Sequence, residues 1–250
     1  MDIAVLIFDR ITALDAVGPY EVLSRLPGAT VRFVAAERGA KRADTGFLSL
    51  VADYGLDDVV EPDVLVVPGG PGTRDLLENG EILDWIRTVH ATTRWTTSVC
   101  TGAMMLGAAG VLQGRRATTH WAAVERLSDY GAHAAGSRVV EDGKVITAAG
   151  VSAGIDLGLR LVQLATGDDL ARAIQLVIEY DPLGQFDAGS PSGAGPGTVA
   201  LAQELLRTPF ATAAPPKLAG EPTQSISVPA SATRARTPGE SGAESRGALP

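Results

Sequence analysis

The chain has 250 residues, of which 45% are hydrophobic, 20% charged and 5% aromatic, a length that suits one α/β domain or two small ones. The formal net charge of −8 argues against general nucleic-acid binding, which depends on clustered Lys and Arg. No apolar run approaches the roughly 18 residues of a membrane span, and residues 1–5 lack the basic start of a signal peptide, so we expect a cytoplasmic protein that does not enter the membrane.

Short apolar runs alternate with helical patterns along most of the chain. We expect strands at residues 3–8, 31–36, 64–67, 95–99 and 145–147. Helices are expected at residues 15–26, 81–91, from 101 onward, 152–166 and 168–179, with a small antiparallel addition near 45–52. Strands that alternate with helices form parallel βαβ units, so the pattern predicts a doubly wound α/β sheet with helices on both faces.

The C-terminal part has a different composition. Residues 198–207 still have an amphipathic helical pattern, but residues 211–250 contain no aromatic residue and are rich in Pro, Ala and Ser. Such a segment buries too little apolar surface to offset the entropy of ordering it. We therefore expect a folded domain over residues 1–210 and a disordered tail over residues 211–250.

Cys100 is the only cysteine, which excludes an intramolecular disulfide and a four-cysteine zinc site. It lies between an expected strand and an expected helix, where a sharp turn forms a nucleophile elbow. At such a turn the thiol faces a helix N-terminus, whose partial positive charge favours the reactive thiolate. The alternative is a buried structural cysteine.

The segment 68–72, Pro-Gly-Gly-Pro-Gly, follows an expected strand. Glycines there allow the backbone to approach a ligand. If this loop lies beside the elbow, the N–H groups of Gly70 and Thr101 could hold a developing anion. An ordinary strand-ending turn is the alternative.

Asp15 lies at the start of the first expected helix, where a capping role is the ordinary explanation. The loop after the first strand also falls at the carboxyl edge of the sheet, where the turn at Cys100 ends. A carboxyl group near the thiol would have a raised pKa and could carry a proton. His120 begins a later helix and could be a base for Cys100, but its spacing favours a structural role. His90 is expected on the surface of its helix.

Taken together, these features resemble the ThiJ/PfpI superfamily, a flavodoxin-like group related to class I glutamine amidotransferases. The matching segments run in order through residues 2–190: 15–19, 68–72, 98–103, 109–114, 117–121 and 149–156. Within the superfamily the sequence is most similar to the isocyanide hydratase branch. Asp15 stands where many members carry Glu, Thr101 follows the nucleophile where protease-like members have His, and residues 179–191 resemble that branch's C-terminal segment.

This resemblance implies a homodimer with its active site near the subunit interface, and a reaction that needs no metal or organic cofactor. The Cys100 thiolate would attack the terminal carbon of an isocyanide while the Asp15 carboxyl group protonates nitrogen, giving a covalent thioimidate. Asp15 would then activate water, and an N-formamide would be released. Thr101 and Gly70 would orient and stabilise the intermediates.

Two alternatives are open. Ligand-sensing domains of AraC-type regulators also resemble this sequence, including its Ser-Val-Cys-Thr-Gly-Ala segment at 98–103. Those regulators carry a helix-turn-helix pair after this domain, whereas residues 191–250 here are mostly Pro-, Ala- and Ser-rich, so DNA binding is not expected. The second alternative is another cysteine enzyme of the superfamily, such as a glyoxalase, deglycase or peptidase.

Overall fold

The computed structural model describes residues 1–182 and 184–207, so the predicted tail over residues 211–250 lies outside the described residues. The central sheet contains β1 (Asp2–Leu6), β2 (Thr30–Ala35), β5 (Tyr54–Gly55), β6 (Val64–Val67), β7 (Trp95–Val99), β10 (Val139–Asp142) and β11 (Val145–Ala148). Its strand order is β10-β11-β7-β6-β1-β2-β5. The pairs are parallel except for the antiparallel edge pair β10–β11. The predicted mostly parallel sheet is therefore confirmed.

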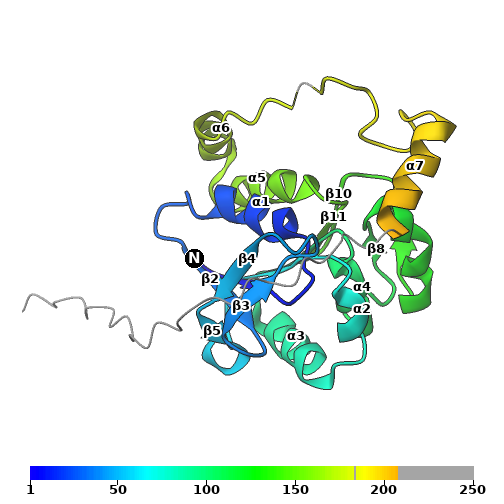
Figure 1. The fold of residues 1–250 in the computed structure, drawn as a ribbon. Coiled ribbons are helices and arrows are strands. Elements are labelled where there is room, and N and C mark those ends of the chain that lie inside the picture. Colours follow the sequence, from blue (N-terminus) through cyan, green and yellow to red (C-terminus); the bar gives the residue numbers. More distant parts are fainter. Residues whose placement is uncertain (183, 208–250) are drawn as a thin grey trace, which may run out of the picture. The chain divides into compact units, whose positions relative to one another are not determined.

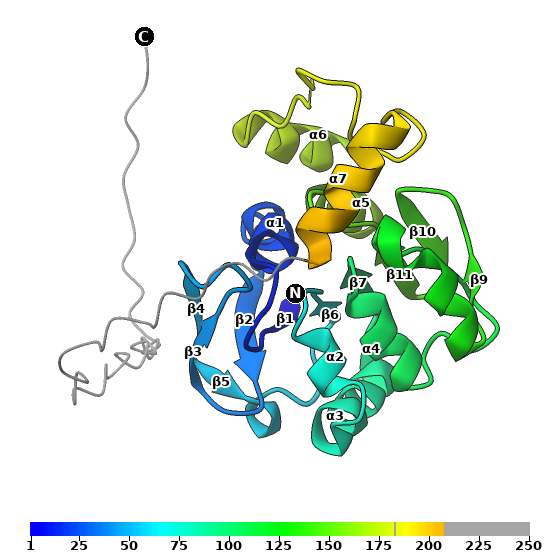
Figure 2. The same ribbon diagram turned by 45° about the vertical axis from the view of Figure 1, so that its right-hand side comes forward.

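Helices cover both faces of this sheet. They are α1 (Ala13–Leu23), α2 (Thr73–Leu76), α3 (Gly80–Thr92), α4 (Gly102–Ala108), α5 (Ala153–Thr166), α6 (Asp168–Val177) and α7 (Pro196–Arg207), with 3₁₀ helices η1 (Leu56–Asp58) and η2 (Trp121–Tyr130). Figures 1 and 2 show α1 and α5 on one face and α3 and α4 on the other. This arrangement is the predicted flavodoxin-like, doubly wound fold.

The central strands explain why the pattern could be recognised. The side chains of β1 from Ile3 to Leu6, and all of those in β6, are completely buried. Strands covered by helices on both faces have continuous apolar runs rather than alternating ones. Because β1 lies between β2 and β6, the connections after β1 and β6 leave in opposite directions. The carboxyl ends of these two strands therefore border the crevice in which such sheets bind ligands.

Close contact between α1 and α5 fixes the helix that carries Asp15. A Cβ atom at Gly154 would lie 2.8 Å from Pro19 Cδ, and one at Gly158 would lie 2.8 Å from Val22 Cβ. The two helices therefore approach at a distance that only glycine allows at these positions. This packing holds α1 against the sheet and places Asp15 at the edge of the crevice.

Some local features differ from the expectations. The antiparallel addition is confirmed as the pair β3 (Gly39–Arg42) and β4 (Ser49–Ala52), which begins earlier than expected. A second small pair, β8 (Arg116–Ala117) with β9 (His133–Ala134), and the edge strand β10 were not predicted. The surface position expected for His90 is wrong, because its ring is half-buried and its Nδ1 lies 2.8 Å from Thr96 Oγ1.

Among the described residues, none of the helices combines the length and apolar character needed to cross a membrane.

Candidate active site

Cys100 occupies the sharp turn between β7 and α4. Its φ of 57° is in the left-handed region that residues other than glycine rarely adopt. The Cys100 N–H donates to the carbonyl oxygens of Ala148 and Ala149 at 3.1 and 3.2 Å, which ties the turn to the end of β11. The residue is only 5% exposed. The predicted elbow is therefore present, and its backbone strain is held by hydrogen bonds from the sheet.

Asp15 lies inside α1 and is completely buried. Asp15 does not cap the helix, because α1 already begins at Ala13. The Asp15 Oδ2 instead accepts a hydrogen bond of 2.9 Å from Gly69 N–H. The other oxygen, Oδ1, has no hydrogen-bond partner. Burial raises the pKa of Asp15 to about 7, and the charge of nearby Asp44 acts in the same direction. The carboxyl group is thus able to hold or release a proton near neutral pH.

The Asp15 carboxyl and the Cys100 thiol are near enough to affect each other's pKa, so the pair competes for protons. Burial, followed by the charge of Asp15, raises the pKa of the thiol well above its usual value. The N–H and hydroxyl of Thr101 both interact with the sulfur and lower this pKa, but they do not outweigh the other two effects. The expected preference for the thiolate is therefore not found in the free protein, because burial was not visible in the sequence.

The loop at 68–72 lies beside the elbow, which was the condition for its possible role at the site. A Cβ atom at Gly69 would lie 2.5 Å from Thr101 N and 3.0 Å from Asp15 Oδ2, so only glycine fits between these two groups. The Gly70 N–H donates to Thr101 Oγ1 at 2.9 Å. In this structure the predicted pair of anion-binding N–H groups therefore already has partners, since Gly70 N–H binds the Thr101 hydroxyl and Thr101 N–H faces the sulfur.

His120 lies close to Cys100 while also capping η2. Its Nδ1 accepts a hydrogen bond of 3.2 Å from Ala122 N–H, which is the structural role that its spacing favoured. A Cβ atom at Gly150 would overlap the His120 ring and would lie 3.2 Å from Cys100 Sγ, so the ring and the sulfur border the same point. Burial lowers the pKa of His120, so the ring is neutral at pH 7.

Thr119 was not singled out in the sequence, although it touches the elbow directly. Its hydroxyl donates to the Cys100 carbonyl oxygen at 2.7 Å and is buried. This bond fixes the segment that carries His120 against the turn at Cys100. The Ala-Thr-Thr-His-Trp segment at 117–121 was the available signal, but nothing in its spacing separated Thr119 from its neighbours.

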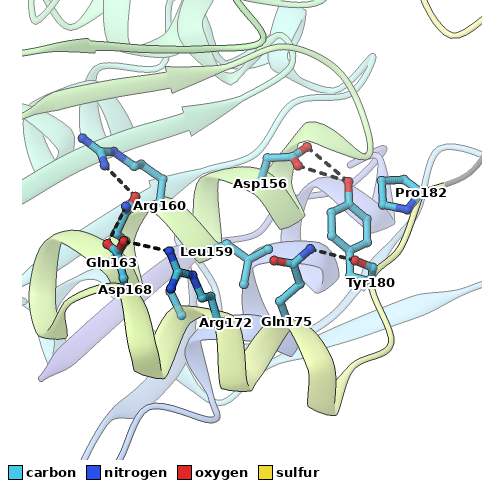
Figure 3. A pocket seen from close by; sticks show the side chains of 10 residues that line it. Asp156, Leu159, Arg160, Gln163, Asp168, Arg172, Gln175, Tyr180 and Pro182 are labelled. Atoms are coloured by element: carbon cyan, nitrogen blue, oxygen red, sulfur yellow. Dashed lines mark hydrogen bonds and ion pairs between the residues drawn. The ribbon is translucent and has the colours of Figure 1, made fainter.

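Two hollows lie apart from this group of residues. Figure 3 shows a pocket of about 400 Å³ between α5 and α6, in which Tyr180 donates to Asp156 and Arg172 pairs with Asp168. A smaller hollow of about 290 Å³ on α1 and α5 is lined mainly by apolar side chains, including Leu14, Val17 and Ile155. Neither hollow is lined by Cys100 or Asp15, so both are separate from the candidate active site around Cys100.

Within residues 1–182 and 184–207, no cluster of three or more His, Cys, Asp or Glu side chains is placed to hold a metal ion.

The chain is similar to known proteins over most of its length. The DJ-1/PfpI family model matches residues 1–164. The chain is 44% identical over 194 residues to isonitrile hydratase from Pseudomonas putida, covering 78% of this chain and 85% of that protein. The crystal structure of a ThiJ/PfpI family protein from Pseudomonas syringae has a TM-score of 0.77 and 35% identity, covering 85% of this chain and 90% of that one. The HTH-type transcriptional regulator CdhR from Pseudomonas aeruginosa is 32% identical over 163 residues, which are 63% of this chain and 48% of the regulator.

Proposed function

The chain belongs to the DJ-1/PfpI family, and from this membership we propose that it is an isocyanide hydratase with Cys100 as the nucleophile and Asp15 as the general acid and base. One observation carries the proposal: a completely buried carboxyl group, Asp15, lies across Gly69 from the turn that holds the only cysteine of the chain. Burial raises the pKa of this carboxyl group to about 7. The 44% identity to an isonitrile hydratase supports the substrate class.

In the first step, the Asp15 carboxylate accepts the thiol proton as Cys100 Sγ bonds to the terminal carbon of the isocyanide. Asp15 then returns that proton to the substrate. The proton goes to the terminal carbon, not to the nitrogen as first expected, because the neutral thioimidate, R–N=CH–S–Cys, carries its hydrogen on that carbon. A group with a pKa near 7 is suited to both halves of this transfer. The Thr101 N–H and hydroxyl stabilise the sulfur while it is negatively charged.

In the second step, the Asp15 carboxylate accepts a proton from water, and the hydroxide adds to the thioimidate carbon. Protonated Asp15 gives this proton to the nitrogen, and the proton of the added hydroxyl goes to the sulfur as the carbon–sulfur bond breaks, which releases the N-formamide, R–NH–CHO, and restores the Cys100 thiol. Asp15 is again a carboxylate and Cys100 a thiol, and the sum is addition of one water to one isocyanide. These steps draw only on residues of this chain and on water.

We also propose that the folded domain extends over residues 1–210 and that the chain forms a homodimer. The apolar hollow on α1 and α5 supports the dimer, because Leu14 beside Asp15 is 41% exposed there. A second subunit on this surface would lie next to the helix that carries Asp15. Sedimentation of the purified chain at the mass of one subunit would contradict this part of the proposal.

The central experiment is hydration of a simple alkyl or aryl isocyanide by the purified chain, with the N-formamide measured by NMR. We expect turnover by the wild-type chain and none above the buffer rate for Cys100→Ala, because no other thiol exists to form the thioimidate. Circular dichroism establishes that both proteins are folded. Folded wild-type protein that yields no formamide would refute the hydratase.

The similarity to CdhR favours one second candidate, a ligand-sensing domain without catalysis. The chain spans about half the length of that regulator, so DNA binding by the whole regulator does not transfer to it. A sensor would bind an isocyanide or related ligand with the same affinity whether residue 100 is Cys or Ala, and it would release no product. Product formation that depends on Cys100 distinguishes the enzyme from the sensor.

A further inference from the structure

The segment between β11 and α5, residues 149–152, borders Cys100. The Cys100 N–H donates to the Ala149 carbonyl oxygen at 3.2 Å, and a Cβ atom at Gly150 would lie 3.2 Å from Cys100 Sγ. Within the part of the chain that the structure describes, the N–H groups of residues 150–152 have no hydrogen-bond partner. The contacts at the two ends of the 149–152 segment therefore decide how firmly it lies against the sulfur.

Arg138, the residue before β10, binds this segment and the start of α5 at three points. Its carbonyl oxygen accepts the Ala149 N–H at 2.8 Å. Its guanidinium group donates from Nη2 to Ser152 Oγ at 3.0 Å and from Nε to Asp156 Oδ2 at 2.6 Å. Ser152 directly precedes α5 and Asp156 lies in the first turn of that helix, so Arg138 holds both ends of the segment.

Tyr180 holds the same carboxylate group. Its hydroxyl lies 3.2 and 3.3 Å from the two carboxylate oxygens of Asp156, as Figure 3 shows. The Tyr180 carbonyl oxygen accepts a hydrogen bond of 3.0 Å from Gln175 Nε2, which ties Tyr180 to α6. The Asp156 carboxylate is therefore fixed by a second element while it binds Arg138.

The ion pair between Arg138 and Asp156 is too exposed to stabilise the fold substantially. Its side chains are 46% and 31% exposed, and exposed ion pairs contribute little to the free energy of unfolding. Arginine differs from lysine in presenting its donors as a rigid planar fork that reaches two acceptors at once. In Arg138 this fork spans Ser152 and Asp156, so the contact fixes the position of the 149–152 segment.

We propose that Arg138 is a positioning residue, which holds the 149–152 segment against Cys100 by binding Ser152 and Asp156 together. Arg138 acts on the sulfur through this segment, because its own hydrogen bonds go to the segment and to α5. The predicted effect on turnover rests on the proposed hydratase function, whereas the predicted effect on access to the thiol does not.

The test is alkylation of Cys100 by iodoacetamide, which reads one site because the chain has one cysteine. Cys100 is almost completely buried, so the reagent reaches the sulfur only when a neighbouring segment moves away. Arg138→Met keeps a long side chain but removes its donors, so the 149–152 segment moves away more often. We expect alkylation to become about three- to tenfold faster, by the same factor at pH 7 and pH 9, because access to the sulfur changes and the titratable groups beside it do not.

Arg138→Lys separates the fork from the charge. Lysine keeps the positive charge beside Asp156 but lacks the planar fork that also reaches Ser152. Alkylation should therefore be faster than in the wild type and slower than in Arg138→Met. Isocyanide turnover should fall in kcat with little change in KM in Arg138→Met, because Cys100 Sγ is held less firmly in the position from which it attacks.

Arg160→Met is the matched control. Arg160 joins the same two elements, α5 and β10, through an ion pair with Glu141 in which Nη2 lies 3.1 Å from Oε2. This pair is similarly exposed, at 36% and 38%, but Arg160 lies one helical turn after Asp156 and so farther from the 149–152 segment. Arg160→Met should leave the alkylation rate unchanged, and urea denaturation should give both variants the wild-type midpoint.

A double-mutant cycle shows whether Arg138 acts through Asp156. Asp156→Ala removes the acceptor of the Nε bond and should itself speed alkylation. Adding Arg138→Met to Asp156→Ala should then cause a smaller acceleration than Arg138→Met causes in the wild type, because only the contact with Ser152 is left to lose.

Two results would overturn the inference: a wild-type alkylation rate in Arg138→Met, or an equal acceleration in Arg160→Met. Ser152→Ala removes one of the two side-chain contacts with a minimal change and answers the same question if Arg138→Met does not fold. Faster alkylation of Arg138→Met, in a chain whose wild type makes no formamide, would refute the hydratase and support Arg138. Formamide production by the wild type, with an unchanged alkylation rate in Arg138→Met, would do the opposite.

Discussion

At the scale of single residues, the proposed chemistry depends on the proton for which Asp15 and Cys100 compete. Each group is buried, and each charge would raise the energy of the other, so the site favours one negative charge over two. A substrate that needs a proton and a sulfur nucleophile in the same step draws both from this pair. In the proposed reaction the strong nucleophile therefore forms as the proton moves, and not before.

Replacing the Asp15 carboxyl group should make the Cys100 thiol more reactive while isocyanide turnover falls. In Asp15→Asn the negative charge beside the sulfur is gone, so the pKa of Cys100 falls and iodoacetamide reacts faster at neutral pH. Isocyanide turnover should nevertheless fall by about 10²–10⁴-fold, because no group remains to carry the proton. Both rates are measured on the same preparation.

Asp75→Asn is the control for that variant, since Asp75 is exposed and pairs with Arg10 at the protein surface. It should change neither rate appreciably. If Asp15→Asn slowed alkylation and turnover together, the carboxyl group would be activating the thiol rather than opposing its ionisation. Turnover at the wild-type rate in Asp15→Asn would remove this residue from the mechanism.

At the scale of helices and strands, the contact between α1 and α5 determines where Asp15 lies. Gly158→Ala adds a Cβ atom 2.8 Å from Val22 Cβ, so α1 must shift to accommodate it. We expect a net loss of roughly 1–2 kcal/mol in the free energy of unfolding, after the gain in helix propensity, together with slower turnover. Urea denaturation measures the first effect and the isocyanide assay the second.

Gly80→Ala makes the same chemical change as Gly158→Ala, but its expected effect on the free energy of unfolding has the opposite sign. Gly80 is the exposed first residue of α3, and a Cβ atom there meets nothing within 4 Å. Alanine should stabilise the protein by up to about 1 kcal/mol and leave turnover unchanged. Equal stabilisation by both substitutions would mean that the α1–α5 contact relaxes without cost.

The sequence predicted the elements that carry the candidate site, because β1 and β6 are apolar runs and the loops after β1, β6 and β7 meet at one edge of the sheet. Cys100 and Asp15 could be placed together by that rule alone. The edge strand β10 was not predicted, because its Val-Val-Glu-Asp sequence lacks a clear apolar run. The hydrogen bonds of the Gly70 N–H and of the Thr73 hydroxyl depend on distances of a few tenths of an ångström, which no sequence pattern encodes.

At the scale of the whole molecule, burial of Asp15 makes the folded state bind a proton that the unfolded chain has already released. Between the ordinary value of 3.8 and about 7, the folded protein is protonated at Asp15 and the unfolded chain is not. This contribution to stability is therefore present in full below pH 3.8 and is lost as the pH rises to about 7. Burial lowers the pKa values of His90 and His120, so their contribution to stability has the opposite pH dependence. It is lost as the pH falls below 6.5.

Subtracting the stability curve of the wild-type protein from that of Asp15→Asn isolates the carboxyl group, since the histidine contributions are common to both. We expect the two proteins to have similar free energies of unfolding near pH 4. The variant should then gain on the wild type as the pH rises, and the difference should level off at a few kcal/mol above pH 7. Urea denaturation at half-unit pH steps gives both curves, and Asp75→Asn should follow the wild type. Parallel curves would show that Asp15 has its ordinary pKa in the folded protein, and the proton transfer at the centre of the proposed reaction would then lose its physical basis.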